Sequence, residues 1–110
     1  MKIISREELK EKLDRGDNFK LYMTLGRQAY EYSHIPGSIH LNNVATEAAK
    51  LSPEEEIVVY CSHPVCTSSI NAYKQFYSLG FKNLYRYAGG LMEWQDAGYP
   101  LEGIIAKECV

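Results

Sequence analysis

The residues best suited to chemistry lie in one short stretch, IVVYCSHPVCTSSINAYKQFYSLGF, residues 57–81. Cys61 directly follows 57–60, a β-branched and aromatic run typical of a buried strand, and apolar residues then recur at helical spacing over 70–79. A thiol in a tight loop between a parallel strand and a helix faces backbone N–H groups and the positive end of the helix dipole. Such surroundings lower a cysteine pKa from its free value of about 8.5, so we expect Cys61 to be a reactive thiolate.

Each of the three cysteines also has a less reactive interpretation. Cys61 could be an inert core thiol, although its place before a proline-containing loop favours reactivity. Only four residues separate Cys66 from Cys61, and two interpretations of Cys66 stay open. It is either a candidate resolving residue that attacks Cys61 once this is persulfidated or oxidised, or a small residue that only fills space. Cys109, next to the last residue, is expected to be exposed and idle.

Length, charge and hydropathy narrow the classes of function. A chain of 110 residues predicts a single domain, 1–110. Its 12 basic residues are scattered and are outnumbered by 14 acidic residues, so no nucleic-acid partner is expected. No apolar run approaches the roughly 20 residues that span a bilayer, so no membrane partner is expected either. The first ten residues lack the features of a secretory signal, which favours a cytoplasmic protein whose odd number of cysteines are thiols.

The elements that must position Cys61 alternate between strands and helices. This alternation predicts an α/β fold with a five-stranded, mainly parallel sheet and helices on both of its faces. Ser5 and Glu8 fit a capping box at the start of the first helix. The expected strands are Lys2–Ile4, Phe19–Met23, Ser38–Leu41, Ile57–Tyr60 and Leu84–Tyr87, and the helices between and after them are expected near 5–14, 28–32, 44–50, 70–79 and 91–97.

Four segments together resemble the rhodanese-like domain, the fold of single-domain sulfurtransferases. They are YSHIPGSIHL at 32–41, VVYC at 58–61, LGFKNLYRYAGGLMEW at 79–94 and GYP at 98–100, and the likeness extends over nearly the whole chain. The resemblance implies that Cys61 is the persulfide-forming catalytic cysteine. It also implies a substrate-binding loop that follows Cys61 and comprises Ser62, His63, Pro64, Val65, Cys66 and Thr67.

By the same resemblance, the expected reaction is the transfer of a sulfane sulfur from thiosulfate or a persulfide donor to a thiol or cyanide acceptor. The implied partners are a small sulfur donor and a thiol acceptor or sulfur-carrier protein. No cofactor and no metal are expected. A Cys61 persulfide as the intermediate predicts ping-pong kinetics.

The chain departs from the family pattern at two places. Met23 and Leu25 stand where members often carry an Asp-x-Arg pair, and Cys66 stands where they commonly have a cation. Residues 57–73 contain no Lys or Arg, so anion affinity would depend on backbone N–H groups, hydroxyl groups and the helix dipole. Arg86 could replace the missing cation, but the sequence favours a surface role for it.

Three functions from other classes compete with this interpretation. A metal site could use Cys61, His63 and Cys66, but structural zinc draws on two separated pairs of ligands. A phosphatase or arsenate reductase shares the thiolate chemistry, but a phosphoryl group requires an arginine that the loop does not offer. The third alternative is a non-catalytic rhodanese-like module that serves as a sulfur carrier or as a binding or redox-sensing domain.

Overall fold

A parallel sheet forms the centre of the computed structural model, which describes residues 1–62 and 67–104. Within these residues the sheet has four strands in the order β2-β1-β3-β4. β3 lies between β1 and β4 and pairs in parallel with both. The strands are β1 Lys20–Met23, β2 Ile39–His40, β3 Ile57–Tyr60 and β4 Leu84–Tyr87.

The prediction of a fifth strand at Lys2–Ile4 was wrong. This segment meets β4 through one isolated parallel bridge, between Ile3 and Arg86. The Ile4 N–H donates to the Arg86 carbonyl at 3.0 Å, and the Arg86 N–H donates to the Lys2 carbonyl at 2.8 Å. The pairing ends there because Ser5 caps a helix immediately afterwards, through the predicted capping box with Glu8.

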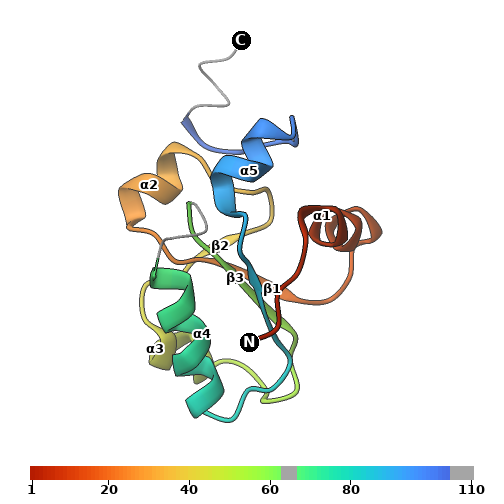
Figure 1. Ribbon diagram of the computed structural model, residues 1–110. Coiled ribbons are helices and arrows are strands. Elements are labelled where there is room, and N and C mark those ends of the chain that lie inside the picture. The colour runs from red at the N-terminus through yellow and green to blue at the C-terminus, as the bar shows by residue number, and fades with distance from the viewer. Residues whose placement is uncertain (63–66, 105–110) are drawn as a thin grey trace.

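Five helices are found among the described residues, and they cover both faces of the sheet, as predicted (Figure 1). They are 5 to 11 residues long, and none is long and apolar enough to cross a membrane. Their bounds are α1 Arg6–Arg15, α2 Arg27–Tyr32, α3 Val44–Ala48, α4 Ser68–Ser78 and α5 Gly90–Asp96.

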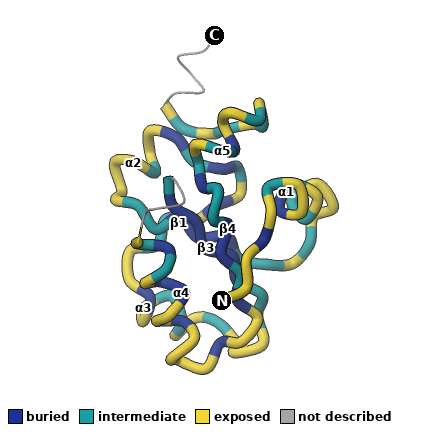
Figure 2. The backbone as a smooth tube through the Cα atoms, viewed as in Figure 1, coloured by how far each residue is buried: buried dark blue, intermediate teal, exposed yellow. Residues whose placement is uncertain are grey.

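The sheet divides the core into two apolar clusters, because successive side chains of a strand point to opposite faces. In β3, Val58 and Tyr60 join the cluster that includes Leu9 of α1 and Trp94 of α5. Ile57 and Val59 join the cluster beneath α3 and α4. All four β3 residues are buried, which Figure 2 shows as the dark blue centre of the chain. β3 is therefore rigidly held on both sides up to the residue before Cys61.

Candidate functional site

Cys61 lies directly after β3, at the carboxyl edge of the sheet, where the sequence places it. Its side chain is buried, yet it belongs to neither apolar cluster. Two hydroxyl groups face the sulfur: the Ser68 Oγ lies 3.5 Å from the Cys61 Sγ, and the Ser62 Oγ lies 4.0 Å from it. Cys61 is disulfide-bonded in the structure. The polar surroundings differ from those of an inert core thiol.

The backbone around Cys61 is fixed by the beginning of α5. The Leu91 N–H donates to the Cys61 carbonyl and the Met92 N–H to the Ser62 carbonyl, both at 2.9 Å. The first N–H groups of a helix have no partner within the helix, so these contacts satisfy both sides. Gly90 permits the turn into α5, because its φ of 71° is in the left-handed region. No local sequence pattern indicates these hydrogen bonds to Cys61 and Ser62.

The first turn of α4 forms the other wall of the site. Thr67, the last residue of the predicted loop, is exposed and occupies the N-cap position without a side-chain capping bond. Ser68 then faces Cys61, and its neighbour Ser69 is buried and accepts a hydrogen bond from the Arg86 Nε at 2.9 Å. The structure thus brings together Cys61, Ser62 and the start of α4, as predicted.

Several predicted site residues fall outside the described residues. They are His63, Pro64, Val65 and Cys66 of the loop, together with Cys109, and their roles stay predictions. Within 1–62 and 67–104, no group of three or more His, Cys, Asp or Glu side chains is arranged to hold a metal ion.

The expectation that Arg86 lies on the surface was wrong. Arg86 is only 7% exposed, and its partner Ser69 is 1% exposed. The strand alternation explains this placement: Arg86 shares a face of β4 with Leu84, which belongs to the cluster beneath α4. The sequence carried this signal, because Leu84 and Arg86 are two residues apart in a predicted strand.

The histidine-proline segment that carries part of the family resemblance is bonded to β3 by Tyr60. The Tyr60 hydroxyl donates to the Ser38 Oγ at 2.9 Å and accepts from the Ile35 N–H at 3.1 Å. Burial raises the pKa of Tyr60 to about 12, so the phenol keeps its proton at neutral pH. The strand that ends at Cys61 is thereby fixed to the 34–38 turn.

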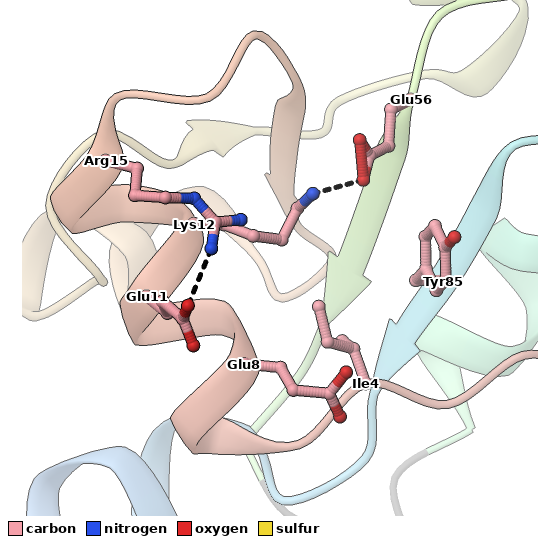
Figure 3. Close-up of a pocket in the computed structure, with 7 residues that line it drawn as sticks. All are labelled: Ile4, Glu8, Glu11, Lys12, Arg15, Glu56 and Tyr85. Atoms are coloured by element: carbon pink, nitrogen blue, oxygen red, sulfur yellow. Dashed lines mark hydrogen bonds and ion pairs between the residues drawn. The ribbon is translucent and has the colours of Figure 1, made fainter.

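A surface cavity of about 220 Å³ lies elsewhere, where α1 packs near the amino end of β3 (Figure 3). Its basic side chains are paired: Lys12 contacts Glu56, and the Arg15 Nη1 lies 2.7 Å from the Glu11 Oε1. A cavity whose three carboxylates outnumber its two basic side chains offers little to an anionic sulfur donor. Its lining residues are Ile4, Glu8, Glu11, Lys12, Arg15, Glu56 and Tyr85.

Comparison with known proteins finds a matching family model and several similar proteins. The family model for the rhodanese-like domain matches residues 5–97. Thiosulfate sulfurtransferase GlpE of Pseudomonas savastanoi pv. phaseolicola is 35% identical over 79 residues, which are 70% of this chain and 72% of GlpE. The protein named "Putative sulfur carrier protein YrkF" of Bacillus subtilis is 30% identical over 93 residues, which are 83% of this chain and 49% of YrkF.

Two further matches extend the comparison. The HTH-type transcriptional regulator Rv0324 of Mycobacterium tuberculosis is 29% identical over 101 residues, and these are 90% of this chain but only 44% of that regulator. The chain therefore spans less than half the length of two of these three relatives. Among solved structures, the rhodanese-like domain of Alr3790 from Anabaena sp. superimposes with a TM-score of 0.83 and 28% identity, covering 96% of this chain and 82% of that domain.

Proposed function

We propose that this chain, which belongs to the rhodanese-like domain family, transfers sulfane sulfur from thiosulfate or a persulfide donor to a thiol or cyanide acceptor. Cys61 is the proposed catalytic residue and carries the sulfur as a persulfide. The observation that carries this proposal is the position of Cys61 at the end of β3, with its sulfur 3.5 Å from the Ser68 hydroxyl at the start of α4. Relatives at about 30–35% identity that are named for sulfur transfer support it.

The proposed cycle has two displacement steps at sulfur. Two thiols first reduce the disulfide of Cys61 by successive exchange, and they leave as a disulfide while Cys61 becomes a thiolate. The thiolate attacks the outer sulfur of the donor, the donor S–S bond breaks, and the leaving group (sulfite or a thiolate) departs with the bonding pair. An acceptor thiolate or cyanide then attacks the outer sulfur of the persulfide and releases the Cys61 thiolate. The hydroxyl groups of Ser62 and Ser68 are close enough to stabilise the charge on the sulfur.

The charge of the loop bears on the choice of donor. Residues 57–73 contain no Lys or Arg, so a thiosulfate dianion would find no basic side chain within this segment. Charge-assisted contacts are about twice as strong as neutral hydrogen bonds. Persulfide donors, which need less charge neutralisation, are therefore the better proposed substrates.

Intact mass spectrometry tests the function directly. The reduced protein is incubated separately with thiosulfate and with a low-molecular-weight persulfide, and it is expected to gain the mass of one sulfur atom that an added thiol or cyanide removes. Addition of sulfur that no acceptor removes would contradict sulfur transfer, and no addition from either donor would contradict the persulfide itself.

A resolving role for Cys66 is a further part of the proposal. If Cys66 attacks an oxidised Cys61, peroxide should remove two thiols from the wild type, those of Cys61 and Cys66. The thiol loss that depends on Cys66 should be missing in Cys66→Ser. Free thiols are counted by a chromogenic disulfide reagent after the peroxide is quenched. Cys109→Ser is the matched control, because it also removes one thiol but lies far along the chain. An equal thiol loss per remaining cysteine in the wild type and both variants would exclude the resolving role.

A second candidate function is a sulfur carrier or redox-sensing module without turnover. The name of YrkF and the disulfide at Cys61 favour it. A carrier would be loaded with sulfur once and would release it only to a partner protein. Multiple turnovers with small thiols or cyanide would distinguish the enzyme from such a carrier.

A further inference from the structure

A buried positive charge lies beneath the start of α4. Arg86 is 7% exposed, and its Nε donates to the Ser69 Oγ at 2.9 Å in buried surroundings. Arginine is rarely buried unless it is paired, because transfer of a charge from water into the protein interior is costly. A guanidinium kept at this position calls for an explanation beyond packing.

The sheet register brings Arg86 close to the strand that bears Cys61. Arg86 pairs with Val59, and Val59 lies two residues before Cys61. Neighbouring strands are about 4.8 Å apart, and both side chains point toward the face that α4 covers. The guanidinium therefore lies on the same side of the sheet as the α4 turn that meets Cys61.

Two consecutive serines connect the cation to the sulfur. The Ser68 Oγ lies 3.5 Å from the Cys61 Sγ, and the Ser69 Oγ accepts from Arg86. Because the two serines are adjacent in the first turn of α4, a bond that fixes one also fixes the other. The guanidinium is therefore bonded to the residue that follows Ser68, whose hydroxyl contacts the sulfur. This region excludes water and screens charge weakly.

We propose that Arg86 is a positioning residue that holds the first turn of α4 against Cys61 and that its positive charge favours the thiolate form of Cys61. Arg86 thus supplies, from β4, the cation that residues 57–73 lack. The inference rests on the proposed function, since it concerns the same sulfur atom.

The other ionisable groups on the surrounding elements either have hydrogen-bond partners or line a surface pocket. Within the described residues, the Tyr73 hydroxyl of α4 donates to the Leu84 carbonyl. The Tyr22 hydroxyl of β1 donates to Glu47 of α3, and the Tyr87 hydroxyl donates to Glu93 of α5. Lys74 and Tyr77 line a surface pocket with Met1. His63 lies outside the described residues, and histidine is the residue type whose free side chain changes charge between pH 5 and 8. A test of the Arg86 charge must therefore keep His63 from titrating.

The test measures the pH dependence of Cys61 alkylation by iodoacetamide in reduced protein. The background carries Cys66→Ser, Cys109→Ser and His63→Gln, so that only Cys61 reacts and no loop imidazole titrates. Arg86→Met should raise the midpoint of the rate profile by about one pH unit, which is a tenfold slower reaction below the midpoint. Arg86→Lys should restore most of the shift, because it restores the charge.

Arg86→Gln separates the effect of the charge from that of the hydrogen bond to Ser69. It is also the variant to measure if Arg86→Met does not fold. Glutamine can still donate to Ser69 but carries no charge, so its midpoint should also rise by about one pH unit. A folded Arg86→Gln protein, verified by circular dichroism, with the background midpoint would overturn the charge role. An Arg86→Lys midpoint raised as far as that of Arg86→Gln would also overturn it.

This experiment uses no sulfur donor, so its failure differs from a failure of the proposed function. A shifted midpoint in a protein that never gains sulfur would refute sulfur transfer and leave the role of Arg86 intact. A fully active protein whose midpoint ignores Arg86 would refute only the inference about Arg86.

Discussion

Cys61→Ser is expected to abolish sulfur transfer, with a loss in kcat/KM of at least about 10³-fold. A serine hydroxyl is not ionised near neutral pH, and it cannot store a sulfane sulfur. The reaction would lose its nucleophile and its covalent intermediate together. Activity is measured as thiocyanate formation from cyanide and as persulfide formation on a small thiol, each with a persulfide donor in excess.

The matched control is Cys109→Ser, which makes the same chemical change near the chain end. It should retain the wild-type rate within about twofold, because Cys109 is expected to be idle. Ser62→Ala is a milder variant than Cys61→Ser, since it removes a hydroxyl group near the sulfur but leaves the nucleophile in place. Residual transfer above about a tenth of the wild-type rate in Cys61→Ser would show that another group carries the sulfur.

Trp94→Ala is expected to reduce the free energy of unfolding by about 3–5 kcal/mol, a large part of the stability of a small domain. Trp94 is fully buried, and its Nε1 donates to the Pro100 carbonyl at 2.8 Å. Its ring lies edge-on to Tyr87 and Tyr99, with centroids 6.0 and 4.8 Å away. The substitution removes these contacts and leaves a cavity. Urea unfolding followed by circular dichroism measures the effect.

Two further variants in α5 bracket this result. Trp94→Phe keeps an aromatic ring and should reduce the free energy of unfolding by less than Trp94→Ala does. Met92→Ala, at a residue of α5 that is 56% exposed, should change the free energy of unfolding by no more than about 0.5 kcal/mol. Equal losses in Trp94→Ala and Met92→Ala would mean that α5 is not anchored through Trp94.

Local patterns made much of this fold predictable from the sequence. β3 and Cys61 could be assigned because a continuous apolar run ends at a loop and a helical period follows. The capping box of Ser5 and Glu8 involves residues only three apart, so it needs no knowledge of the rest of the chain. Features that depend on short-range chemistry were therefore predicted with nearly correct bounds.

Features that depend on distant parts of the chain were missed. Whether Lys2–Ile4 is a strand depends on how far it can follow β4 before Ser5 turns the chain into α1. The burial of Arg86 required a partner 17 positions away, Ser69, whose availability no local pattern indicates. Charged residues in short strands are usually assigned to the surface, and that rule failed where a buried hydroxyl accepts from the charge.

The hydrogen bonds from α5 to the Cys61 segment limit how this loop can be transplanted. Grafting residues 61–67 onto another parallel sheet would transfer the nucleophile but not the hydrogen bonds from α5 that fix its backbone. The Cys61 and Ser62 carbonyls would then lack the Leu91 and Met92 amides. A recipient protein must therefore have a helix whose first N–H groups reach the carbonyl groups of the grafted residues. Otherwise the graft must include residues 89–92 as a second, separate segment.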